Sequence, residues 1–116
     1  MTSTVTLYGI ANCDTIKKAK TWLQDHEIDF EFHDYRKQGL EPELLQTWVR
    51  DLGWEALVNR RGTTWRQLTP EVKNSIDTDS AIEIMLANPA IIKRPLLAIN
   101  DRRYLGFSDE QYSQIF

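Results

Sequence analysis

The chain is poor in cysteine, and this scarcity already excludes several classes of protein. Its 116 residues contain one cysteine, Cys13, which excludes an internal disulfide framework and a cysteine-rich zinc site. Long apolar runs are also missing, so we expect no membrane-spanning segment. The N-terminus lacks the charged-then-apolar pattern of a signal peptide. We therefore expect one domain over residues 1–116, in the reducing environment of the cytoplasm.

Charge of one sign is not in large excess either. The net charge of −3 argues against nucleic-acid binding. Basic residues gather in three short clusters in the second half of the chain: Arg60, Arg61 and Arg66, then Lys93 and Arg94, then Arg102 and Arg103. Local arginine clusters in an acidic protein favour a site for a small anion. The alternative is a solvated basic face.

The first third of the sequence alternates between strand and helix patterns. A β-prone run over residues 4–8 ends at Gly9, and apolar residues at helical spacing predict a helix over residues 14–25. Alternating apolar side chains then predict a strand over residues 28–32. Strand, helix and strand in so short a span predict a parallel pair joined by a right-handed crossover.

Residues 40–90 show no strand pattern and predict an all-helical insertion. Pro42 suits a first helical position, and the apolar stripe that follows it ends at Gly53. Ser80 and Glu83 have the spacing of a capping box at the start of a later helix.

Strand patterns return near the C-terminus. Residues 96–99 and 103–105 predict a hairpin that turns at Asn100 and Asp101, and Ser108 with Gln111 predicts the cap of a last helix. This order of elements is typical of a mixed sheet with helices packed on it.

Cys13 is the first candidate for chemistry, because it lies between a predicted strand and a predicted helix. Main-chain N–H groups at a helix start are unpaired and stabilise a thiolate, which lowers the cysteine pKa. Lys17 lies one helical turn further on, and Asn12 and Thr15 offer further polar groups. We expect Asp14 to cap the helix, with its carboxylate turned toward the first amides. The alternative is that Cys13 is a small buried hydrophobic residue.

Arginines supply the other candidates. Arg94 can clamp an oxyanion or a carboxylate, and Pro95 after it is a place for a cis peptide bond. Arg60 and Arg61, followed by Gly62 and a short helix start, predict an anion cradle, unless they belong to a solvated loop.

Histidines give no sign of a metal centre. His26 and His33 do not have the spacing of metal ligands with Cys13 or with a pair of carboxylates. We expect neither a bound metal nor a bound cofactor.

Several stretches together resemble the bacterial arsenate reductase (ArsC) family. Residues 5–19 resemble its opening segment, most of all that of the branch with the YffB-type proteins and the Spx regulators. The same pattern is matched by residues 33–36, 53–57, 61–66, 92–96 and 106–108. The resemblance implies a thioredoxin-like α/β fold, with helices on both faces of a mixed sheet and an all-helical insertion at about residues 40–90. It also implies that Pro95 is a cis-proline that faces Cys13.

The resemblance implies a chemistry as well. In arsenate reductases of this family one cysteine attacks arsenate, arginines hold the oxyanion, and glutathione and glutaredoxin complete the cycle. Cys13 and Arg94 match the family cysteine and one arginine, and Arg60 or Arg61 lies near a second. The last family arginine falls near Gly106, and no arginine stands at that position. Arg102 and Arg103 are close to it in sequence but need not point inward, and this gap argues against arsenate itself.

From the resemblance we expect a thiol reductase with one nucleophilic cysteine and glutathione as co-substrate. Its substrate is a small thiol compound or oxyanion, and glutaredoxin is a further partner. The alternative is a non-catalytic regulator that, like Spx, docks on RNA polymerase. Ile16 stands where many Spx proteins have a second cysteine, so an intramolecular dithiol switch is excluded. The single domain and small net charge favour a monomer.

Overall fold

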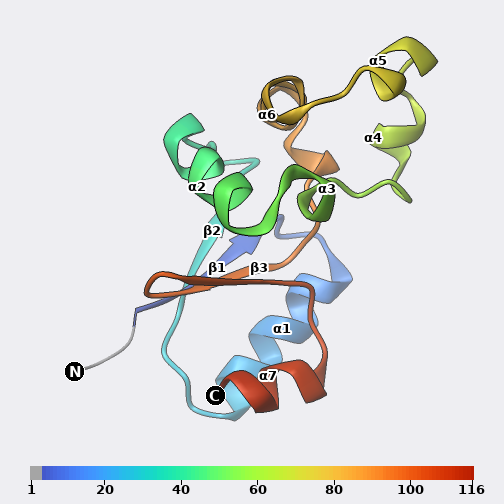
Figure 1. Cartoon of the computed structure of the whole chain (residues 1–116). Coiled ribbons are helices and arrows are strands. Elements are labelled where there is room, and N and C mark those ends of the chain that lie inside the picture. The colour runs from blue at the N-terminus through green and yellow to red at the C-terminus, as the bar shows by residue number, and fades with distance from the viewer. Residues whose placement is uncertain (1–3) are drawn as a thin grey trace. The chain divides into compact units, whose positions relative to one another are not determined.

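A computed structural model describes residues 4–116, which form two compact units (Figure 1). The sheet unit contains the described residues up to Gln38 together with Arg94–Phe116, and the helical unit is Gly39–Lys93. The predicted insertion at residues 40–90 therefore forms a compact unit of its own. The expectation of a single domain over residues 1–116 stays a prediction.

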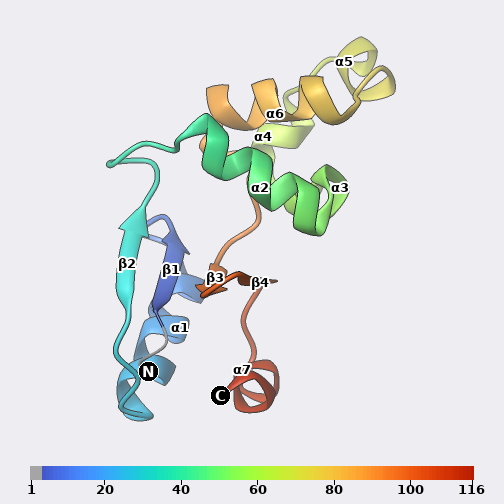
Figure 2. The same ribbon diagram turned by 60° about the vertical axis from the view of Figure 1, so that its left-hand side comes forward.

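The sheet unit is built on four strands in the order β2-β1-β3-β4. Its elements are β1 (Val5–Gly9), α1 (Asp14–Asp25), β2 (Glu31–Asp34), β3 (Leu96–Ile99), β4 (Arg102–Leu105) and α7 (Asp109–Ile115). β1 and β2 are parallel, as predicted, and β3 runs antiparallel to both β1 and β4. The sheet is therefore mixed, and Figure 2 shows β1 and β2 side by side.

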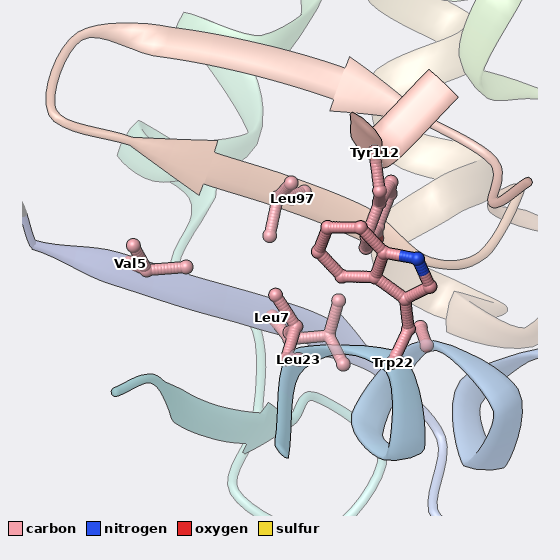
Figure 3. Close-up of a cluster of buried hydrophobic side chains, with 7 residues drawn as sticks. Val5, Leu7, Trp22, Leu23, Leu97 and Tyr112 are labelled. Atoms are coloured by element: carbon pink, nitrogen blue, oxygen red, sulfur yellow. The ribbon is translucent and has the colours of Figure 1, made fainter. Parts of the chain in front are cut away.

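One face of this sheet carries the core of the unit. Val5 and Leu7 on β1 share that face with Leu97 on β3, because alternate residues of a strand point to the same side and Leu7 pairs with Leu97. These side chains are buried against Trp22 of α1 and Tyr112 of α7 (Figure 3). Their burial fixes α1 along β1, so the helix begins next to the end of that strand.

The helical unit consists of short helices. They are α2 (Pro42–Leu52), α3 (Trp54–Leu57), α4 (Thr63–Arg66), α5 (Pro70–Asn74), α6 (Thr78–Ala87) and the 3-10 helix η1 (Pro89–Ile91). α2 packs against α3 and α6, and its buried face carries Leu45, Trp48 and Val49. Pro42 is the first residue of α2 and Gly53 ends it, as the sequence predicted. Gly53 has a positive φ of 85°.

The largest differences from the predicted bounds are in β2 and α6, whereas β1 and β4 differ by one residue. β2 begins at Glu31 rather than at residue 28, because the N–H of Ile28 is still bonded to the carbonyl of Leu23 at the end of α1. The helix expected to start at Ser80 starts one turn earlier. Asp77 is its cap, and Ser80, as the third helical residue, returns the bond to the Asp77 N–H.

Candidate active site

β1 and β2 end, and β3 begins, at the same edge of the sheet. Gly9 of β1 lies beside Asp34 of parallel β2, and Tyr8 lies beside Leu96 of antiparallel β3. The residues that follow β1, follow β2 and precede β3 are therefore neighbours. This register brings Cys13, Tyr35 and Arg94 to one edge, although they are distant in sequence.

Cys13 is the N-cap residue of α1, and the residue is partly exposed. Its carbonyl accepts the first intrahelical hydrogen bond, from the N–H of Lys17 at 3.1 Å. The sulfur makes no regular capping hydrogen bond, but the N–H groups of Ile16 and Thr15 lie close enough to stabilise its ionised form through weak ones. The helix start thus presents unpaired main-chain donors to the sulfur.

Gly9 allows this approach of helix to strand. A Cβ at Gly9 would overlap Cδ1 of Ile16, a side chain that is fully buried. The absence of a side chain at Gly9 lets the first turn of α1, and Cys13 with it, lie close against the end of β1.

Arg94 adds a positive charge to the same sulfur. Burial alone would raise the pKa of the Cys13 thiol, but the N–H of Ile16, the Arg94 guanidinium and the N–H of Thr15 together hold it below its ordinary value. The hydrogen bonds of Arg94 to Cys13 and to the phenol of Tyr35 raise the pKa of the guanidinium, against the effect of its own burial. Arg94 therefore favours the ionised form of Cys13, and Cys13 favours the charged form of Arg94.

Pro95 sets the direction of the chain at Arg94. The Arg94–Pro95 peptide bond is cis, as the resemblance implied. The carbonyl of Pro95 accepts the N–H of Gly106 at 2.9 Å, which continues the β3–β4 pairing up to this residue. Arg94 therefore lies just outside the sheet, two residues before β3 begins at Leu96.

Asp34 is a residue of this edge that sequence reasoning missed. It is 5% exposed, and it is the one buried charged residue among those described. Its carboxylate accepts the main-chain N–H groups of Ala11, Arg36 and Lys37 at 3.1, 2.9 and 3.2 Å. Although burial opposes this, these bonds hold the pKa of Asp34 below its ordinary range.

Tyr35 was missed as well. Its side chain is 1% exposed, and its hydroxyl lies against Arg94. Burial raises the pKa of Tyr35 to about 12. Both Asp34 and Tyr35 fall in a segment that matched the family pattern, and the usable signal was a run of polar residues directly after a strand.

The candidate residues that are near Cys13 in the sequence do not all lie near its sulfur. Thr15 contributes its main-chain N–H, and Asn12 lies exposed in the preceding turn. Lys17 lines a separate pocket with Trp22 and Phe107. The predicted cap at Asp14 is wrong, because Cys13 itself occupies the cap position and Asp14 is the first helical residue.

Arg60 and Arg61 belong to the helical unit. Both are exposed and line a pocket with Glu55, Asn59 and Lys93. The Arg60 guanidinium lies 5.5 Å from the ring centroid of Trp54 and 5.7 Å from that of Trp65, within cation–π range. α4 has only four residues, so the pocket depends on side-chain cations rather than on a helix start. Their role in anion binding stays a prediction.

Both histidines contact aromatic side chains. His26 stacks on Trp22 with ring centroids 3.7 Å apart, and His33 lies beside Tyr8. Within residues 4–116 no group of three or more His, Cys, Asp and Glu side chains could hold a metal ion. No helix in the same range is both long and apolar enough to cross a membrane.

Comparison with known proteins places this chain in a family. A model of the ArsC family matches residues 8–115. An uncharacterized protein of Haemophilus influenzae is 45% identical over 112 residues, which cover 97% of this chain and 98% of that protein. The global transcriptional regulator Spx of Streptococcus agalactiae is 29% identical over 109 residues, which cover 92% of this chain and 79% of the regulator.

Two solved structures share the fold at comparable or higher identity than these relatives. A protein named YFFB is 45% identical, with a TM-score of 0.90 over 96% of this chain and 97% of its own. An arsenate reductase (ArsC) related protein from Brucella melitensis is 49% identical, with a TM-score of 0.81 over 96% of this chain and 92% of its own. The predicted thioredoxin-like α/β fold and the family resemblance are thereby confirmed.

Proposed function

The chain belongs to the ArsC family, and on that premise we propose that it is a thiol oxidoreductase with Cys13 as its nucleophile. One observation carries the proposal. Cys13 is a partly exposed residue, and its sulfur faces two main-chain N–H groups and the Arg94 guanidinium, which together lower its pKa. A thiolate that is both stabilised and accessible is the reactive form of cysteine.

The proposed reaction is the reduction of a mixed disulfide between glutathione and another thiol compound. The Cys13 thiolate attacks the glutathione sulfur, an S–S bond forms, and the other sulfur leaves as a thiolate that takes a proton from water. A second glutathione thiolate then attacks the new disulfide and releases Cys13. The leaving sulfur has been reduced, and two glutathione molecules have become one disulfide.

An external thiol is required because Cys13 is the one cysteine of the chain. Glutathione supplies it directly, and glutaredoxin is a further source. Both are found in the cytoplasm, where we place this reaction. We further propose that Arg60 or Arg61 orients the carboxylates of glutathione.

A disulfide fits the site better than arsenate does. Arg94 is already hydrogen-bonded to Cys13 and Tyr35, which favours stabilisation of the thiolate over capture of an oxyanion. Arg102 and Arg103 do not replace the missing family arginine. The β3–β4 register pairs them with Ile99 and Ala98, at the end of the hairpin away from Leu96 and the site.

The test measures turnover of the mixed disulfide of glutathione and 2-mercaptoethanol, with arsenate assayed in parallel. We expect disulfide turnover that Cys13→Ser abolishes and that Thr21→Ser, a control on the exposed face of α1, leaves intact. The rate of iodoacetamide alkylation against pH should give a thiol pKa below the free value of about 8.5. Turnover that survives in Cys13→Ser, or a thiol pKa at or above that value, would contradict the proposal.

Regulation of transcription is the second candidate, favoured by the Spx relatives. In this case the chain docks on RNA polymerase and turns over no substrate. Co-purification with RNA polymerase that persists in Cys13→Ser, together with no disulfide turnover in the wild type, would favour this function over the first.

A further inference from the structure

Tyr35 occupies an unusual position for a tyrosine at the edge of a sheet. It follows β2 directly, and its N–H is bonded to the carbonyl of Gly9 at 3.1 Å, so the β1–β2 pairing extends to it. Its ring is almost fully buried, yet its hydroxyl reaches the Arg94 guanidinium. The phenol therefore contacts the same guanidinium that contacts the Cys13 sulfur.

The sheet unit offers a second buried tyrosine for comparison. Tyr112 of α7 is fully buried in the core, and its hydroxyl has no hydrogen-bond partner among the described residues. A buried phenol can thus be tolerated here for its apolar ring alone. The hydroxyl of Tyr35, in contrast, is directed at a charged group that the proposed chemistry needs.

The chemistry of the two groups fixes the direction of the bond. Because burial raises the pKa of Tyr35 to about 12, its hydroxyl keeps its proton at neutral pH. A guanidinium can only donate hydrogen bonds, so the Tyr35 oxygen accepts one from Arg94. An arginine side chain has many rotamers, and a rigid acceptor held by a buried ring restricts them.

We propose that Tyr35 is a positioning residue that holds the Arg94 guanidinium against the sulfur of Cys13. Without the Tyr35 oxygen, Arg94 turns toward solvent for part of the time and the thiolate loses part of its charge partner. The inference rests on the proposed function in one respect, namely that Cys13 is the nucleophile whose ionisation matters. It adds that the reactivity of this thiol depends on a side chain that need not touch the substrate.

The experiment is a double-mutant cycle read out as the pH profile of Cys13 alkylation by iodoacetamide. The four proteins are the wild type, Tyr35→Phe, Arg94→Gln and the double variant. We expect Arg94→Gln to raise the midpoint of the profile by about one pH unit and Tyr35→Phe by about half a unit. The double variant should match Arg94→Gln alone, because Tyr35 has nothing left to position.

Tyr112→Phe is the matched control, since it removes a hydroxyl from an equally buried ring of the same unit. It should leave the midpoint unchanged. The proposal is wrong if Tyr35→Phe also leaves the midpoint unchanged, or if its shift persists in full when added to Arg94→Gln. Circular dichroism at each pH shows whether every variant is folded.

Arg94→Lys gives a second test that needs no change at Tyr35. It keeps the positive charge but removes the planar fork that can bind two partners at once. We expect its midpoint to rise nearly as far as that of Arg94→Gln, whereas a wild-type midpoint would mean that charge alone suffices and would overturn the proposal. Alkylation of Cys13 requires no catalytic turnover, so the two proposals can fail separately. A wild type that does not reduce disulfides would contradict the proposed function, whereas the pH profiles of alkylation test the role of Tyr35.

Discussion

The carboxylate of Asp34 accepts a hydrogen bond from the main-chain N–H of Ala11 at 3.1 Å, and so joins the end of β2 to the loop that presents Cys13. The other oxygen of the same carboxylate holds the N–H groups of Arg36 and Lys37. One buried charge therefore organises both the turn after β2 and the turn before α1. The carboxylate thus ties the loop that precedes Cys13 to the end of β2.

The first prediction concerns Asp34→Asn. The amide keeps the size of the side chain but places an NH₂ group against a main-chain donor, so we expect a loss of about 1–3 kcal/mol in the free energy of unfolding at neutral pH. Urea denaturation followed by tryptophan fluorescence measures this loss. Asp29→Asn, at an exposed carboxylate, is the control and should change the free energy of unfolding little.

The same pair of proteins should differ in their response to acid. The folded-state pKa of Asp34 lies below its value in the unfolded chain, about 3.9. Its contribution is therefore complete above the unfolded-state pKa and is lost as the pH falls through the folded-state pKa. We expect the stabilities of the wild type and Asp34→Asn to converge in strong acid, and a constant difference from pH 7 to pH 2 would contradict this account.

The second prediction concerns Gly9→Ala. The added methyl group overlaps the buried side chain of Ile16, and we expect a destabilisation of about 1–3 kcal/mol, together with slower alkylation of Cys13 as the helix start moves. Ile16→Val removes Cδ1 and makes room. The loss of stability in the double variant should therefore be smaller than the sum of the losses in the two single variants. Strictly additive losses would show that the overlap is relieved elsewhere.

The third prediction concerns Tyr112→Phe. The Tyr112 hydroxyl is buried without a hydrogen-bond partner among the described residues, and burial raises the pKa of its phenol. Removal of an unsatisfied polar atom from a core costs little and can stabilise, so we expect the free energy of unfolding to stay equal or to rise by up to about 1 kcal/mol. A clear loss of stability in urea denaturation would mean that the hydroxyl has a partner, such as a buried water.

The bounds of an element could be predicted from the sequence where several local signals mark the same residues. The bounds of α1 over residues 14–25 and of β3 over residues 96–99 were correct, because apolar spacing and turn residues both mark them. The start of α6 was placed one turn late because Asp77 and Ser80 are both good cap residues. Spacing alone does not decide which residue caps the helix and which takes the third helical position.

The site was predicted in part for a related reason. Cys13 follows a strand and precedes a helix, and a local pattern contains that information. The contacts of its sulfur do not follow from local patterns, since Arg94 reaches it only through the pairing of β3 with β1. Asp34 and Tyr35 were missed because their burial depends on the register of β2 against β1, which begins later than the alternation of residues 28–32 suggested.

The last prediction separates the two arginines of the helical unit. Arg60 lies within cation–π range of the rings of both Trp54 and Trp65, whereas Arg61 has no cation–π contact among the described residues. A guanidinium that is already ordered loses less entropy on binding a carboxylate. We therefore expect Arg60→Gln to raise the KM for glutathione about tenfold at unchanged kcat, the effect of losing uniform binding, and Arg61→Gln to raise it less. Steady-state kinetics at varied glutathione concentration measures both, and a larger effect at Arg61, or an equal fall in kcat, would reverse the assignment.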